Sequence, residues 1–115
     1  MKNLEQTRAA NALEPAQKLK RSAISGLPAL ILQNGLLATA AFCNADGGGP
    51  NRKDMRAALD ATASHLAKLE LLSKDTTTAR EMIDDLSKCD SLHLQRAVVE
   101  SLAFIAYLKR LSQRG

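Results

Sequence analysis

The sequence Gly26–Phe42, GLPALILQNGLLATAAF, is a nearly unbroken apolar segment that opens with glycine and proline. Pro28 suits the first turn of a helix, where its missing N–H would have no partner. The few polar side chains point in different directions around a helical axis, so the helix has no polar face. They are Gln33, Asn34 and Thr39. The segment is therefore predicted to be a buried central helix that other helices surround.

The remaining sequence is also typical of helices, because alanine, leucine, lysine, arginine and glutamate dominate and runs of β-branched or aromatic residues are missing. A first helical region is predicted over residues 2–24, bent or split at Pro15, which has no N–H to donate. A flexible loop follows the apolar helix at 44–50, and Asn51 can cap a helix that runs to about Leu72.

Two further helix starts are indicated by local signals. Thr78 and Glu81 have the spacing of a capping box, and Asp90 can cap the last long helix. The short helix after Thr78 is expected to turn its apolar side chains inward. These are Met82, Ile83 and Leu86. We therefore predict an all-α protein with one domain over residues 1–115, a bundle of about five helices around the buried apolar helix.

Length and cysteine content limit the class of protein. At 115 residues the chain is one domain, long enough to bury roughly two thirds of its unfolded surface without cross-links. Cys43 and Cys89 lack CxxC spacing, and without a secretory signal we expect reduced thiols in a cytoplasmic protein; a bridge between them is the minor alternative. The apolar segment is too short and too interrupted at residues 33–35 to favour a membrane span.

Basic residues gather toward the two ends of the chain, whose formal net charge is +4. At about 100° per residue, the arginines of the last helix share one face, opposite Leu94, Val98, Ile105 and Leu108. If the terminal helices pack together, both clusters make one phosphate-binding surface. The alternative is an ordinary solvated helix face. The candidate residues are Lys18, Lys20 and Arg21 in the first cluster, and Arg96, Lys109, Arg110 and Arg114 in the second, with Arg96, Arg110 and Arg114 on the shared face.

Aromatic side chains are scarce, which restricts how nucleic acid would be bound. The sequence has only Phe42, Phe104 and Tyr107, all in apolar helices. Proteins that read single strands generally stack bases on exposed aromatic rings, so stacking is not expected here. Binding should be to the nucleic-acid backbone, insensitive to base sequence and sensitive to salt.

The sequence offers no convincing catalytic or metal site. Cys89 and His93 have the spacing of a metal pair but no further ligands, and His65 is expected to be a surface residue. The adjacent carboxylates Asp84 and Asp85 point about 100° apart, and Gly47–Gly49 lacks the lysine that a phosphate-binding glycine loop needs. We therefore predict no enzymatic activity, no catalytic residues, no metal ligands and no cofactor.

Several stretches resemble one known family, the small subunit of the type III-B CRISPR effector, the Cmr complex. The similarity in the apolar segment lies around its proline, at the Asn34-Gly35 pair and over Thr39–Phe42. A second similarity covers Glu100–Phe104 and Leu108–Ser112, and a weaker one covers Leu4–Gln6, Arg8-Ala9 and Ala12. The chain departs from the family in having no tryptophan in the last helix, where it offers Tyr107, and in Pro15.

The resemblance implies a non-catalytic subunit that stacks along the effector filament and helps to hold the guide–target RNA by backbone contacts. The implied partners are guide and target RNA, the repeating backbone subunit with other CRISPR effector subunits, and neighbouring copies of the chain, with no membrane. A small helical adaptor that binds an acidic protein partner is the main alternative. A basic DNA-binding regulator is the third possibility, although no helix-turn-helix is visible.

Overall fold

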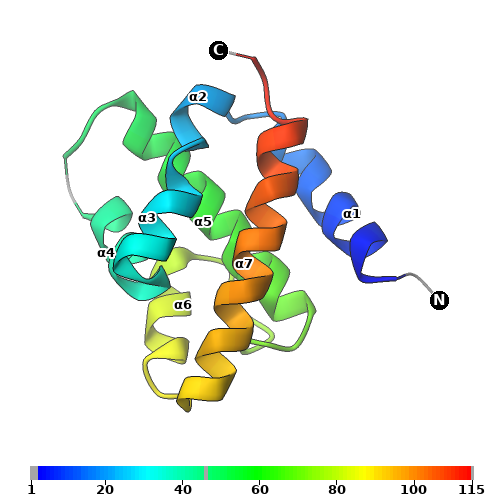
Figure 1. The fold of residues 1–115 in the computed structure, drawn as a ribbon, viewed down its shortest axis with the longest axis vertical. Coiled ribbons are helices and arrows are strands. Elements are labelled where there is room, and N and C mark those ends of the chain that lie inside the picture. The colour runs from blue at the N-terminus through cyan, green and yellow to red at the C-terminus, as the bar shows by residue number, and fades with distance from the viewer. Residues whose placement is uncertain (1–2, 46, 115) are drawn as a thin grey trace.

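Seven helices make up the regular structure of residues 3–45 and 47–114, which are the residues that the computed structural model describes (Figure 1). This confirms the all-α prediction. Lys2, the expected start of the first helix, and Asp46, in the expected loop, lie outside the described residues. The helices are α1 (Leu4–Ala16), α2 (Arg21–Ile24), α3 (Leu27–Asn34), α4 (Leu36–Asn44), α5 (Pro50–Lys68), α6 (Ala79–Leu86) and α7 (Ser91–Leu111).

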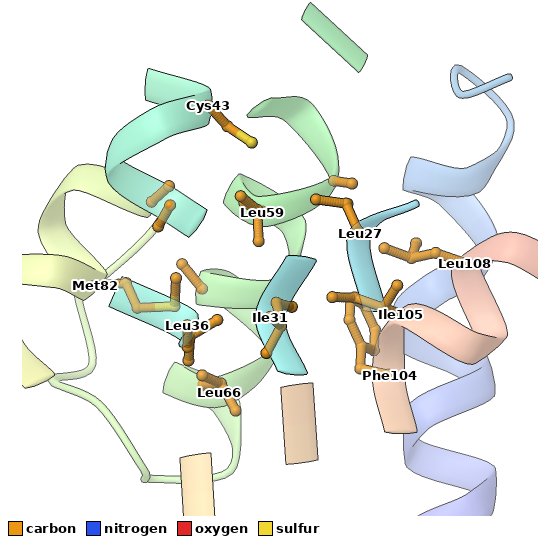
Figure 2. Packing of buried hydrophobic residues seen from close by; sticks show 14 of the residues in the cluster. Leu27, Ile31, Leu36, Cys43, Leu59, Leu66, Met82, Phe104, Ile105 and Leu108 are labelled. Atoms are coloured by element: carbon orange, nitrogen blue, oxygen red, sulfur yellow. The ribbon is translucent and has the colours of Figure 1, made fainter. Parts of the chain in front are cut away.

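The centre of the bundle is α5, which packs against α1, α2, α4, α6 and α7. Leu59 and Leu66 of α5 are completely buried, and Figure 2 shows side chains from its neighbours converging on them. The apolar cluster joins all of the long helices, so the described residues share one core. The largest contributions from the other helices come from Leu27, Ile31, Leu36, Met82, Phe104, Ile105 and Leu108.

The apolar segment was expected to form one continuous buried helix, and this prediction is wrong. Gly35 divides it into α3 and α4, because its backbone angles of φ 92° and ψ 157° belong to a region that side chains rarely allow. The two short helices then bury only one side each. Ile31 and Leu36 are 2% exposed, whereas Leu30 is half-buried.

The outer side of α3 and α4 is therefore apolar and open to solvent. Leu32 is 73% exposed and Phe42 is 51% exposed. Among the described residues, no helix combines the length and the apolar character needed to cross a membrane.

The expected split near Pro15 is present. Helix α1 begins with a reciprocal cap between Asn3 and Gln6, and it ends one residue after the proline, before the single turn of α2. The predicted cap at Asn51 is wrong. Pro50 takes the first helical position of α5 and Gly49 precedes it, because proline fixes a helical φ and needs no N–H partner there. Helix α5 ends at Lys68, four residues before the expected Leu72.

The two other caps are confirmed. The Thr78 hydroxyl accepts a hydrogen bond from the Glu81 N–H at 3.2 Å, and the Asp90 carboxylate accepts one from the His93 N–H at 2.8 Å. Each cap satisfies a backbone donor that has no partner within its own helix. Met82 and Leu86 are buried as predicted, and Ile83 is partly buried against the same core.

Substituting Gly35 tests the division of the apolar segment. A Cβ added at Gly35 would meet no atom within 4 Å, so the cost of Gly35→Ala comes from its positive φ alone. We expect the free energy of unfolding to fall by about 1–3 kcal/mol. Gly26→Ala is the matched control, because Gly26 has a helical φ of −84° and equally open surroundings, and it should not destabilise the protein. Equal effects in denaturant unfolding would contradict this account.

Candidate nucleic-acid interface

Basic residues from residues 18–21 and 109–114, which lie far apart in the sequence, meet at one end of the bundle. The Arg21 N–H donates to the Gln113 carbonyl at 2.8 Å, and the Gln113 N–H donates to the Leu19 carbonyl at 2.9 Å. The side-chain amide of Gln113 also donates to the carbonyl of Gln17. Figure 1 shows the consequence, with α2 and the C-terminal end of the chain at the same end of the molecule. The condition for one shared basic surface, that the terminal segments pack together, is therefore met.

We call this surface the basic end. The stretches 17–21 and 109–114 that form it contain no aspartate or glutamate. All of its cationic residues are exposed except Lys109, which is half-buried. Its cations therefore have no acidic neighbour within either stretch. They are Lys18, Lys20, Arg21, Lys109, Arg110 and Arg114.

Arg21 has a structural task within the basic end. Its guanidinium donates to the carbonyls of Lys109 at 2.8 Å, Arg110 at 3.1 Å and Ser112 at 3.4 Å. Carbonyls in the last turn of a helix have no partner within that helix, and a cation there also complements the helix dipole. Arg21 thus closes α7 and holds the two basic stretches together, while its charge still adds to the surface.

The predicted shared face of three arginines is wrong in part. Helix α7 ends at Leu111, and the backbone at Ser112 is extended, so Arg114 does not continue the helical face. Arg96 and Arg110 are both exposed on α7, but fourteen residues separate them, which is about 21 Å along a helix. The structure therefore places Arg114 with the basic end and leaves Arg96 outside it.

An acidic end lies at the other end of α7, around α6. Residues 69–90 carry six acidic and three basic side chains. Several of them line a hollow of about 420 Å³ beside Ser73 and Thr76. Helix α7 has 21 residues, so about 30 Å separates the acidic end from the basic end. The carboxylates at the hollow are those of Asp75, Glu81, Asp84 and Asp85.

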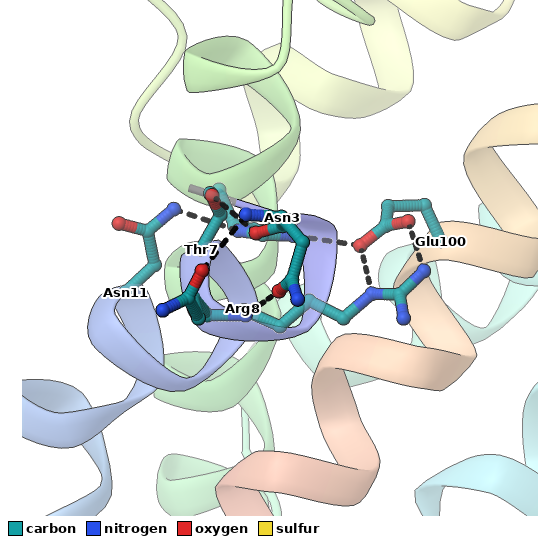
Figure 3. Close-up of polar contacts among 7 residues, drawn as sticks. Asn3, Thr7, Arg8, Asn11 and Glu100 are labelled. Atoms are coloured by element: carbon teal, nitrogen blue, oxygen red, sulfur yellow. Dashed lines mark hydrogen bonds and ion pairs between the residues drawn. The ribbon is translucent and has the colours of Figure 1, made fainter. Parts of the chain in front are cut away.

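His65 is buried, contrary to the expected surface position, and belongs to a polar network under α1. Its Nε2 lies 2.9 Å from the Glu100 carboxylate and its Nδ1 lies 2.9 Å from the Asn11 amide. Arg8 donates two hydrogen bonds of 2.8 Å to Glu100, one to the oxygen that His65 contacts and one to the other oxygen (Figure 3). The His65 ring also stacks on Phe104 with ring centres 4.2 Å apart. The sequence did not reveal this network because its members lie on three helices and up to 92 residues apart.

The network keeps Glu100 ionised and His65 neutral. Burial alone would raise the pKa of Glu100, but hydrogen bonds from Arg8 and His65 outweigh it and the pKa is lowered. The pKa of His65 is also lowered, because burial outweighs the opposing effects of its hydrogen bond to Glu100 and of the Glu100 charge. Neutral His65 can donate from Nε2 to Glu100 and accept from Asn11 at Nδ1, which satisfies both ring nitrogens.

Cys89 and His93 have structural contacts in place of a shared ligand. The Cys89 thiol donates to the Leu86 carbonyl at 3.1 Å, and His93 Nε2 lies 2.6 Å from the Leu71 carbonyl. Cys43 and Cys89 are both free, and burial raises the pKa of the Cys43 thiol. Within 3–45 and 47–114, no group of three or more histidine, cysteine or carboxylate side chains is arranged to hold a metal ion.

Comparison with protein families decides the identity of the bundle. A model of the CRISPR-associated protein (Cas_Cmr5) family matches residues 4–114. The chain belongs to this family. It is therefore a small subunit of the type III-B Cmr complex, and this membership implies other CRISPR subunits and RNA as partners. Searches of curated proteins and of solved structures gave no match. Arg8 and Glu100 both lie in stretches that resemble the family. This resemblance was the one signal in the sequence that could have indicated the network.

The lowered pKa of His65 predicts that this Cmr small subunit loses stability in mild acid. Between the folded pKa and the ordinary value of 6.5, the unfolded chain binds more protons than the folded chain. The free energy of unfolding should therefore fall as the pH drops below about 6.5, with a slope from this residue of at most about 1.4 kcal/mol per pH unit. Urea unfolding from pH 7.5 to 5.5 measures the slope, and His65→Gln should reduce it.

The His65 ring can also be followed directly by NMR in the unmutated protein, which avoids any folding defect of the variant. A titration midpoint above 6.5 would contradict the predicted direction. His93→Gln provides the matched control for urea unfolding, because it removes a histidine that is not part of the Arg8–Glu100 network.

Proposed function

We propose that this subunit binds the sugar–phosphate backbone of guide–target RNA through the basic end while other subunits cut the RNA. The observation that carries the proposal is the convergence of six cationic residues from both ends of the chain, in stretches free of acidic residues. Lysine and arginine contacts to phosphate release counterions and fix no base sequence. Lys18, Lys20, Arg110 and Arg114 are the exposed candidates for direct contact, Lys109 is half-buried, and Arg21 positions them. Arg96 is a separate candidate at a distance.

The aromatic residues support binding to the backbone over binding to bases. Phe104 is buried, Tyr107 is half-buried, and the exposed Phe42 has the Arg52 guanidinium over its ring, 4.2 Å from the centre. Phe42 is thus the one ring of the three that is mostly exposed, and Arg52 already occupies one of its faces. Affinity should depend strongly on salt and little on base sequence.

Opposite charges at the two ends of α7 support stacking of copies along a filament. Copies that point in one direction would bring the acidic end of one toward the basic end of the next. A head-to-tail contact of this kind leaves both outer ends open for further copies. At physiological salt the attraction acts over about 8 Å, so it can orient neighbours without pairing every cation. The repeating backbone subunit is the other partner that we propose for this filament.

The proposed role is architectural and non-catalytic, in the cytoplasm, and needs no cofactor. Cys89 and His93, the residues with the most suggestive spacing, are engaged in holding the turns around α6. The family match favours this role over the adaptor and the DNA-binding regulator considered from the sequence.

Neutralising the basic end should weaken RNA binding without unfolding the protein. We choose Lys18→Gln, Lys20→Gln and Arg114→Gln together, because all three side chains are exposed. The affinity of the assembled complex for RNA should fall for every base sequence, and the slope of log affinity against log salt should flatten by roughly 0.7–0.9 per lost phosphate contact. Stability should change by no more than about 0.5 kcal/mol per site.

The matched control removes the same charge from the acidic end, with Lys74→Gln, Arg80→Gln and Lys88→Gln, all at exposed residues. If the position of the charges matters, the control keeps the affinity and salt slope of the unmutated protein. Equal losses in both variants would show that only net charge matters, and no loss in the first variant would exclude the basic end as an RNA site.

The absence of catalysis is tested with purified protein and labelled single-stranded RNA. We expect the RNA to stay intact with Mg²⁺, with Mn²⁺ and without metal. Cleavage that co-purifies with the protein and disappears in His93→Ala would overturn the non-catalytic role. The same variant should lose the contact to the Leu71 carbonyl and unfold at a lower denaturant concentration.

A further inference from the structure

The outer face of α7 carries an apolar stripe that no helix of the described residues covers. Leu92, Val99 and Ala106 recur every seven residues, which is 20° short of two full turns, so they lie nearly in line along the helix. Leu92 is 60% exposed, Val99 is 66% exposed and Ala106 is half-buried. Figure 1 shows α7 between α1 and α3, and its inner side is the one that carries Phe104 and Leu108 into the core.

The stripe runs into a hollow between α7 and α3 at its C-terminal half. This hollow of about 500 Å³ is lined by Pro28 and Leu32 from α3 and by Leu102 and Ala106 from α7. Leu32 is the most exposed of the large apolar residues described, at 73%. We call the stripe and this hollow together the α7 groove. Its length from Leu92 to the end of the hollow is about 21–27 Å, or four to five turns of a helix.

The charged residues that line the α7 groove itself are cations. Arg96 lies beside the stripe, while Arg21, Lys109 and Arg110 line the hollow. The only acidic residue within α7 is Glu100, which is 6% exposed and points inward to Arg8 and His65. An occupant of this groove would therefore face apolar side chains along its length and cations from Arg96 to the hollow, while its other end would lie at Leu92, next to Asp90 and the acidic end.

We infer that the α7 groove binds an amphipathic helix from another protein subunit, with an apolar stripe of heptad spacing and acidic residues toward the end that lies in the hollow. A straight apolar seam of this length is the complement of a helix, which presents anchors at intervals of three, four and seven residues. Opposite charges at the rim fix the orientation of such a helix and raise its association rate.

The other occupants fit less well. RNA phosphates could meet the cations of the hollow, but Leu32 and Val99, which are 73% and 66% exposed, would offer them no hydrogen bond. A second copy docked by the same face would bring the arginines of the two copies together, and like charges at an interface cost several kcal/mol. The acidic helix α6 of a second copy cannot supply the apolar seam either, because Met82 and Leu86 are buried in its own core.

This inference does not rest on RNA binding, and separate residues test the two proposals. A photo-cross-linking benzoylphenylalanine is placed at Leu32 in one variant and at Val99 in another, both in the assembled effector complex. Both positions should cross-link to one segment of another subunit, with a heptad stripe and with acidic residues toward the end that cross-links at Leu32. Cross-links to RNA, to a second copy or to different segments, or no cross-links at all, would overturn the inference.

The double variant Leu32→Ser and Val99→Ser then measures the strength of the contact. Both side chains are mostly exposed, so the protein should fold as before. Its affinity for a synthetic peptide of the cross-linked segment should fall at least tenfold, while RNA affinity stays unchanged. Leu13→Ser, at a leucine on α1 that is 53% exposed, is the matched control and should bind the peptide normally. Equal peptide affinity in the double variant and the control would overturn the inference.

Discussion

The arrangement of the terminal helices depends on the contacts that the buried Glu100 carboxylate makes. Helix α1 buries only Ala12 and Ala16 completely, and one methyl group contributes about 0.8 kcal/mol of burial energy. Hydrogen bonds to a charged group contribute about 1.5–3 kcal/mol each, and Glu100 receives two from Arg8 and a further contact from His65. The polar contacts therefore decide where α1 lies on α5 and α7, although part of their energy offsets the desolvation of Glu100.

The position of α1 determines where positive charge gathers. Once α1 lies along α7, the chain leaves α1 near the C-terminal end of α7, and Arg21 can donate to three of the carbonyls there. Arg56 acts in the same way on α4, donating to the carbonyls of Cys43 and Ala45 at 3.1 and 3.4 Å. In both cases a cation donates to a helix end whose last carbonyls have no N–H donor within the helix. Arginines with such structural contacts thus bring cationic stretches together without burying additional charge.

The features that could be predicted from the sequence are those set by nearby residues. The caps at Thr78 and Asp90 and the end of the first helix near Pro15 each depend on a few neighbouring side chains, and all three are confirmed. The start of α5 was misplaced because two local signals competed, and Pro50 prevailed over Asn51. The break at Gly35 was missed because an apolar run with few polar residues gives the same pattern whether it is one helix or two.

Features that depend on tertiary contacts could not be derived from periodicity. His65 looked like a surface residue because its partners lie on α1 and α7, and Arg114 looked helical because nothing nearby indicated that α7 ends at Leu111. The resemblance to the Cmr small subunit supplied the family and RNA as an expected partner. It did not indicate which basic residues come together, which only the pairing of Gln113 with Leu19 and Arg21 reveals.

The chemistry of the surface separates two kinds of contact on one helix. At its C-terminal end α7 lies beside other cationic stretches, and Leu111 is the largest exposed apolar side chain of the helix there. This surface suits the charged, hydrated backbone of RNA. Along its outer face the same helix offers leucine, valine and alanine between cations, which suits a protein surface that can be dehydrated. Arg110 lies where these two surfaces meet, so its charge acts on both. A substitution there would change RNA affinity and protein contacts together, whereas Lys18 and Val99 each belong to one surface alone.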